Sequence, residues 1–504
     1  MISRPFLLIV FLAGCFGPKP FAVAAEIHSN GLGGGKWSSA DTWEEKRVPT
    51  AVDVVVIASN DTVTFDRDDS ASDTCTSLLL DPEARLEFES GMGKRVLRLG
   101  GSIEAYGHLR LDGTQAPTDQ LEIWLVGKSP RRVTLLKGGG LILSGYPNLP
   151  EERRNVVVKS LEEKPDWPTA PASLDAGTRS SLDIQNARLE NLAITAQNIN
   201  NTGIRPNERL NFMGSLFVNS QITLRKCDTP RIAGNVFTAR KGPGQAISLQ
   251  SSPLAEIQRN RISGYSEGIS HQGEEIMLLD NVIEACGKGI RYVGNPNAMI
   301  RGGRIAGCTM GVEMHEAGGV IEDLEIANCL TGIHSYRSNF QVNNVRFNEL
   351  PAKGQALNLG QSGATLLNCN VRPEQVKHAE SGATALHYVI VKVNGKLPAD
   401  ALVSLRPVAD SPDGTPAPEA RNSPAPLRDD GLTPLPASLG ALEVRVWQIN
   451  REGKLLPAPT YRLSIGQPSA DGSFKELKSM TLPAEATEFR ENLSSEKPTL
   501  ELNL

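Results

Sequence analysis

The chain has 504 residues, too long for one compact core of ordinary size, so its length predicts either several domains or one elongated repeat body. Its 57 acidic and 52 basic residues leave a formal charge of -5, and no basic block is dense enough to neutralise a run of phosphates, which excludes nucleic acid as an expected partner. The seven cysteines form no CxxC pair and are too few for a disulfide scaffold, so no zinc site is predicted.

Residues 1–25 are predicted to be a cleaved export signal. One Arg precedes an apolar run from Phe6 to Phe16, small residues precede Glu26, and the run is too short to span a bilayer. Two processing routes remain open: ordinary cleavage among the small residues 22–25, or cleavage at a lipobox, Leu12 to Cys15, with lipid on Cys15. Both predict a secreted or cell-envelope protein of a bacterium, with a lipid at Cys15 as the only expected membrane attachment.

Residues 26–145 are predicted to form a β-rich segment that starts a solenoid, because short strand-like runs alternate with glycines and show no helical period. The stretch from Asn30 to Asp66 contains Trp37, Trp43 and the apolar run Val54 to Ile57. This stretch resembles the opening of the eight-glycine domain family of extracellular proteins. The resemblance implies that a β-helix follows, and some members of that family bind or act on hyaluronan-like polysaccharides.

Residues 146–380 are predicted to be parallel β-helix repeats, beginning with a long excursion over 146–181 that lies over a groove like a lid. The repeat is clearest in IEACGKGI, IAGCTMGV and IANCLTGI, and the glycines recur at spacings of 21, 22 and 21 residues, at Gly268, Gly289, Gly311 and Gly332. A fixed period of this length is typical of a stacked solenoid, and scattered Gly and Asn favour strands over helices.

Asn235, Asn260 and Asn281 occupy one phase of the repeat, which predicts a ladder of stacked side-chain amides at a turn between strands. This N-x-[IF] and G-[IV] pattern resembles the right-handed parallel β-helix of pectate-lyase-like proteins. The fold class is therefore predicted to be all-β, a right-handed single-stranded parallel β-helix with a small C-terminal antiparallel β-sandwich. The resemblance allows calcium as a cofactor, although the residues themselves identify none.

Cys286, Cys308 and Cys329 share one column with Tyr265 and are predicted to be a reduced stack inside the solenoid. After about Ser381 the period ends. Residues 381–504 are predicted to form the β-sandwich-like module, with a proline-rich loop over 409–436.

The residue after each Gly-Ile pair should face outward, and this row contains Ser270, Arg291, Glu313, His334 and Asn358. Arg291, Glu313 and His334 on adjacent rungs are the predicted catalytic residues, because such groups would clamp a uronate carboxylate and move the proton at its C5. The alternative is a row of mixed charges that only keeps the rod soluble.

Other polar groups give weaker predictions. Arg261, Arg304, Glu325 and Arg346 form a second outward row, interpreted as a surface ion-pair ladder. His271, His315 and His334 are offset differently from the Gly-Ile pairs, so no metal site is assigned.

The predicted function is an exported β-helix protein that binds an extracellular polysaccharide along the solenoid and is a candidate for its cleavage, as a polysaccharide lyase or glycoside hydrolase. The alternative is a noncatalytic cell-surface structural or adhesion protein.

Overall fold

The computed structural model describes residues 25–91, 93–127, 131–161, 171–200, 209–240, 244–273, 275–294 and 297–388, and farther along the chain residues 390–394, 402–407, 425–426, 443–456, 461–468, 474–482 and 499–503. Of the predicted export signal, only residue 25 lies within these ranges, so Cys15 lies outside them. The predicted proline-rich loop is likewise outside them apart from residues 425–426.

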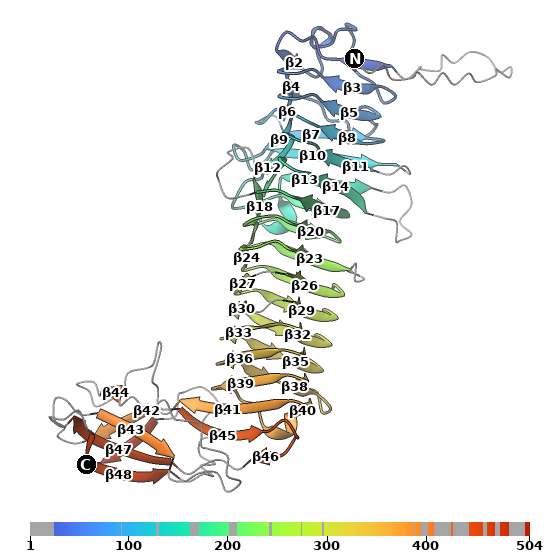
Figure 1. Ribbon diagram of the computed structural model, residues 1–504. Coiled ribbons are helices and arrows are strands. Elements are labelled where there is room, and N and C mark those ends of the chain that lie inside the picture. The colour runs from blue at the N-terminus through green and yellow to red at the C-terminus, as the bar shows by residue number, and fades with distance from the viewer. Residues whose placement is uncertain are drawn as a thin grey trace.

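The described chain winds into a rod whose wall consists of parallel sheets, as predicted (Figure 1). Sheet I contains 15 strands, in stacking order β1 (Glu26–His28), β3 (Val54–Ile57), β5 (Ser77–Leu80), β8 (Ile103–Ala105), β11 (Arg132–Leu135), β14 (Ala172–Ala176), β17 (Leu192–Gln197), β20 (Gln221–Arg225), β23 (Gln245–Gln250), β26 (Glu267–Gln272), β29 (Lys288–Val293), β32 (Met310–His315), β35 (Thr331–Tyr336), β38 (Gln355–Gly360) and β40 (Val376–Ala379).

Sheet II runs beside it. Its parallel strands are β2 (Gly34–Lys36), β4 (Thr62–Phe65), β6 (Arg85–Phe88), β9 (His108–Asp112), β12 (Gly140–Ser144), β15 (Ser181–Gln185), β18 (Leu210–Met213), β21 (Arg231–Ala233), β24 (Ala255–Gln258), β27 (Ile276–Leu279), β30 (Ala298–Arg301), β33 (Gly318–Glu322), β36 (Asn339–Asn343), β39 (Gly363–Leu367) and β41 (Gly382–Tyr388).

Sheet III contains 11 strands, β7 (Lys94–Leu99), β10 (Gln120–Val126), β13 (Val156–Leu161), β16 (Arg188–Glu190), β19 (Leu216–Val218), β22 (Val236–Thr238), β25 (Arg261–Ser263), β28 (Val282–Glu284), β31 (Arg304–Ala306), β34 (Glu325–Ala327) and β37 (Arg346–Asn348). Three single-turn 3₁₀ helices, η1 (Ala40–Thr42), η2 (Glu151–Arg153) and η3 (Pro373–Gln375), complete the described part of the rod. No helix in the described ranges has the length and apolar character needed to cross a bilayer.

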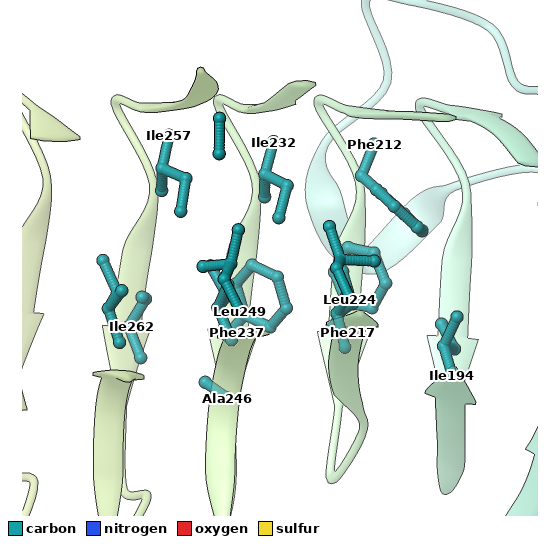
Figure 2. Packing of buried hydrophobic residues seen from close by; sticks show 14 of the residues in the cluster. Ile194, Phe212, Phe217, Leu224, Ile232, Phe237, Ala246, Leu249, Ile257 and Ile262 are labelled. Atoms are coloured by element: carbon teal, nitrogen blue, oxygen red, sulfur yellow. The ribbon is translucent and has the colours of Figure 1, made fainter. Parts of the chain in front are cut away.

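The core is a column of apolar side chains enclosed by the sheets. Within each strand alternate residues point inward, so the same kind of side chain stacks on the next coil about 4.8 Å away. Figure 2 shows this packing, in which the ring of Phe217 lies against that of Phe237 with their centroids 4.5 Å apart and their planes 7° apart. The Gly-Ile repeat exists because Ile269, Ile290 and Ile333 are buried rungs of this column.

The turn between sheets II and III is built in the same way in coil after coil. Its first residue adopts the left-handed backbone conformation, which favours Gly, Asn and Asp. The residues in this position are Asn186, Gly214, Gly234, Arg259, Asp280, Gly302, Asp323 and Asn344, with φ between 50° and 65°. This conformation explains why Asn, Asp and Gly recur at one phase of the repeat.

The predicted asparagine ladder follows that residue. The Asn235 side-chain nitrogen Nδ2 donates to Oδ1 of Asn260 at 3.0 Å, and Nδ2 of Asn260 donates to Oδ1 of Asn281 at 3.0 Å. The backbone N–H of Asn235 also donates to Oδ1 of Asn260, and the backbone N–H of Asn260 donates to Oδ1 of Asn281. All three side chains are buried. The ladder therefore satisfies backbone donors that the turn would otherwise leave unpaired inside the protein.

The predicted excursion over 146–181 is only partly correct. Residues 156–161 and 172–176 are β13 and β14, regular members of sheets III and I, so the described excursion from the stack ends at Asn155. Val-rich VVVKSL satisfies the strand alternation. The Pro and Glu residues just before it led to the longer prediction.

All six cysteines in the described ranges are free and buried. Cys286, Cys308 and Cys329 stack on one another beside buried Tyr265, whose hydroxyl donates to the carbonyl oxygen of Ser220 at 2.7 Å. The predicted reduced interior stack is confirmed for these residues.

At the end of the stack the chain direction reverses. β45 (Glu443–Ile449) pairs antiparallel with β41, and β46 (Leu455–Leu456) pairs with β45. A separate antiparallel sheet contains β44 (Ala425–Pro426), β43 (Leu402–Pro407), β47 (Tyr461–Pro468) and β48 (Phe474–Leu482). This antiparallel module agrees with the predicted fold class. One pair, β42 (Ile390–Asn394) with β49 (Thr499–Asn503), is parallel.

Candidate functional site

The row that was predicted from the sequence exists in the structure. Strand register places Ser270 opposite Arg291, Arg291 opposite Glu313, Glu313 opposite His334 and His334 opposite Asn358, on consecutive strands of sheet I. The three predicted catalytic residues are therefore neighbours on one face of the rod.

Their charges are partly neutralised by one another. Oε2 of Glu313 lies 3.1 Å from Nε of Arg291 and 2.7 Å from Nζ of Lys288, which belongs to the strand of Arg291. Lys288 also lies 3.9 Å from Glu267 on the preceding strand. An anionic ligand at this row would have to compete with Glu313 for Arg291 and Lys288.

The three histidines do not lie on one surface. His334 faces outward, and its Nδ1 is buried without a hydrogen-bond partner among the described residues. His315 is exposed and packs against the ring of Tyr336, with centroids 5.2 Å apart. His271 points into the core and is 1% exposed. Only His334 shares the row with Arg291 and Glu313.

The His271 side chain is unusual for the core of the rod because it is polar. Neither ring nitrogen of His271, nor the hydroxyls of Tyr292 and Ser335, has a hydrogen-bond partner within the described part of the chain. His271 faces Tyr292 on the next strand. Desolvation lowers the pKa of His271 to about 4 and raises that of Tyr292, so both are held neutral in the core.

The second predicted row is an ion-pair ladder only in part. Nη1 of Arg304 lies 2.7 Å from Glu284, and its Nε lies 3.5 Å from Glu325. Arg261 is separated from Arg304 by Val282 and instead pairs with Glu151 in the excursion. This long-range pair holds the excursion against the side of sheet III.

A large groove lies where the excursion meets sheet III, and sequence reasoning did not find it. Its volume is ≈ 950 Å³, within the range of ligand-binding clefts. This charged groove is lined by Pro117, Thr118, Asp119, Gln120, Glu122, Leu149, Glu152, Arg153, Arg154, Asn155, Val157, Lys159, Arg188 and Glu190. More than half of these residues are charged, with acids and bases in equal number.

The carboxylates on the floor of the charged groove are fixed by neighbouring cations. Glu122 accepts a hydrogen bond from Nε1 of Trp124 and lies 3.2 Å from Nζ of Lys159. Nζ of Lys159 lies 4.2 Å from the centroid of the Trp124 ring, and Nζ of Lys94 lies 5.3 Å from it. With cations against its ring, Trp124 supports the charged floor and is a poor platform for stacking sugars.

The wall of the charged groove carries two arginines without a carboxylate partner. Arg153 and Arg154 follow one another in the excursion, and neither forms an ion pair with a described residue. Nη1 of Arg154 donates to the carbonyl oxygen of Pro147 at 3.3 Å, but its buried Nε has no acceptor in the described ranges. Desolvation lowers the pKa of the Arg154 guanidinium. Arg153 is exposed, so its guanidinium is open to an anion in the charged groove.

Asn155 holds this wall in place. Its buried side chain donates to the carbonyl oxygens of Gly113 and Ala116 and accepts from the backbone N–H of Tyr146. The sequence feature that could have indicated the charged groove is the pair Arg153-Arg154 just before a Val-rich strand. That pair belongs to the segment that was predicted to lie over a groove, although the groove's floor was not predicted.

Comparison with known proteins supports the fold. A family model for the right-handed β-helix region matches residues 220–371, which include the strands from β20 to β39. No curated protein and no solved structure matches the chain. Over the matched region the chain is a right-handed parallel β-helix.

Proposed function

We propose that this protein is exported from a bacterium and binds an acidic polysaccharide in the charged groove. The observation that carries the proposal is the unpaired Arg153-Arg154 wall facing a cleft of ≈ 950 Å³ on a rod-shaped β-helix. Guanidinium groups form strong bidentate hydrogen bonds with carboxylates and sulfates, the charged groups of such polymers. The long open face of a solenoid suits a ligand that is itself a chain.

The test is the double variant R153A/R154A. Each lost charge-assisted hydrogen bond contributes about 1.5 to 3 kcal/mol, so we expect the affinity for an acidic polysaccharide to fall at least about tenfold. Affinity electrophoresis and calorimetry with uronate-containing, sulfated and neutral polysaccharides would measure the change. The control is R346A, which removes an exposed arginine from sheet III outside the charged groove.

Each outcome of this experiment is decisive for the charged groove. The proposal is supported if R153A/R154A binds an acidic polysaccharide more weakly than the wild type while R346A binds it equally well. A loss of affinity at high salt also supports it. Equal binding of neutral and acidic polymers, or retention by R153A/R154A of wild-type affinity, contradicts it. If no acidic polymer binds, the noncatalytic structural or adhesion role is the better explanation.

The row Arg291, Glu313 and His334 is the first place to test for cleavage. Size-exclusion chromatography would show whether the wild type shortens any polysaccharide. For a polysaccharide that is shortened, proton transfer by these three groups predicts that R291A/E313A/H334A loses turnover by at least about a hundredfold. Its circular dichroism should stay unchanged because all three side chains face outward. Full turnover in a folded triple variant would exclude the row as catalytic.

A further inference from the structure

A second groove lies on sheet II and is lined in part by residues of β45. β45 joins the stack near the other end of the rod (Figure 1). Its volume is ≈ 750 Å³. This amide groove is lined by Asn297, Gly319, Val320, Asn339, Phe340, Gln341, Gly363, Ala364, Thr365, Gly382, Ala383, Thr384, Gln448, Ile449, Asn450 and Arg451. None of these residues belongs to the charged groove, so the two clefts are separate.

The floor of the amide groove is a row of hydrogen-bonding side chains, one on each strand. Register places Gln341 opposite Thr365, Thr365 opposite Thr384, and Thr384 opposite Gln448 on the antiparallel strand β45. The side chains of Gln341, Thr365 and Thr384 make no hydrogen bond to any described residue. Three donor and acceptor groups therefore face the cleft at intervals of about 4.8 Å.

Glycines make the floor deep on one side of this row. Asn339, Gly363 and Gly382 lie opposite one another on successive strands, two residues before Gln341, Thr365 and Thr384. A Cβ atom added at Gly363 would lie 2.5 Å from Oδ1 of Asn339, so the absence of a side chain leaves this amide accessible along the cleft.

The chemistry of the lining selects an uncharged ligand. Arg451 is the only ionisable side chain among the lining residues, whereas charged residues make up more than half of the charged groove. Amides and hydroxyls both donate and accept hydrogen bonds, as do the hydroxyl groups of a sugar. An anionic ligand would find few cations here, and an apolar ligand would leave the amides unsatisfied.

We propose that the amide groove binds a neutral glycan chain in an extended conformation, running along the rod. One sugar unit of an extended glycan has nearly the length of one solenoid rung, so successive units would meet Gln341, Thr365 and Thr384 in turn. This site is independent of the acidic-polysaccharide proposal, because the two clefts share no residue.

The test uses the mature chain and linear neutral oligosaccharides of glucose, mannose, galactose and N-acetylglucosamine, titrated by calorimetry. The variant Q341A/T365A/T384A should weaken binding of the best ligand at least about tenfold, since three neutral hydrogen bonds of about 1 kcal/mol each are lost. The control T64A changes a threonine that points outward from sheet II near the N-terminal end of the rod. The affinity of T64A for the same oligosaccharide should equal that of the wild type.

A single substitution separates loss of a ligand contact from misfolding. Q341A removes one neutral hydrogen bond from an exposed side chain and should weaken binding about fivefold with an unchanged unfolding midpoint. R153A/R154A should bind the neutral ligand as the wild type does, which distinguishes failure of this site from failure of the charged groove. The proposal is overturned if no neutral oligosaccharide binds the wild-type chain, or if the triple variant keeps full affinity.

Discussion

Replacing Asn260 by leucine is expected to lower the free energy of unfolding by about 3 to 5 kcal/mol, because several buried polar groups then lose their partners together. The Asn260 side chain donates at 2.8 Å to the carbonyl oxygen of Ile232 and at 3.0 Å to Asn281. Its oxygen accepts from both the backbone and the side chain of Asn235. Leucine fills a similar volume but can make none of these four hydrogen bonds.

Denaturant unfolding followed by circular dichroism would measure the loss for Asn260→Leu. The matched control is Asn343→Leu, the same change in an outward-facing residue of β36 that makes no side-chain hydrogen bond to the rest of the described chain. The control should stay within about 0.5 kcal/mol of the wild type. A wild-type midpoint for Asn260→Leu would mean that the amide ladder contributes little to stability.

Acidification is expected to destabilise the protein through His271. Its pKa is about 4 in the folded chain and 6.5 in the reference state, so the unfolded chain binds more protons between these values. The stability contributed by neutral His271 is complete above pH 6.5 and is lost as the pH falls toward 4, at up to about 1.4 kcal/mol per pH unit. Between pH 7 and pH 5 the loss amounts to about 2 kcal/mol.

The variant His271→Leu tests this effect, because Leu249 already occupies the same position one rung earlier. Other groups also titrate over this range, so the measured quantity is the difference in pH dependence between the variant and the wild type. The drop in unfolding free energy from pH 7 to pH 5 should shrink by about 2 kcal/mol. The control His315→Gln alters an exposed ring and should keep the full drop. An unchanged drop in His271→Leu would assign the pH sensitivity to other groups.

The sequence predicted the regular part of the fold and the row on sheet I because both follow from a constant coil length. Paired residues in sheet III are 21 or 22 positions apart from Arg261 through Val282, Arg304 and Glu325 to Arg346. With that spacing, a residue's place in its own coil determines which residue lies beside it on the next one.

The charged groove could not be predicted in this way. Lys94 pairs with Gln120, Leu121 with Val156 and Val157 with Arg188, which are separations of 26, 35 and 31 residues. Irregular coil lengths conceal the alignment of Trp124 with Lys159 and of Lys159 with Glu190. The placement of Arg153 and Arg154 depends on how the excursion folds back. The hydrogen bonds of Asn155 that hold it join residues about 40 positions apart in the chain.

The antiparallel strand β45 affects how copies of this protein can associate end to end. An open parallel stack ends in a strand whose unpaired amides and carbonyls can accept the first strand of another copy, which leads to fibres. In sheet II that last parallel strand, β41, is already paired with an antiparallel strand of the same chain. On this sheet an incoming copy would meet β45, which runs in the wrong direction to continue the parallel register, so in-register end-to-end addition is blocked at sheet II.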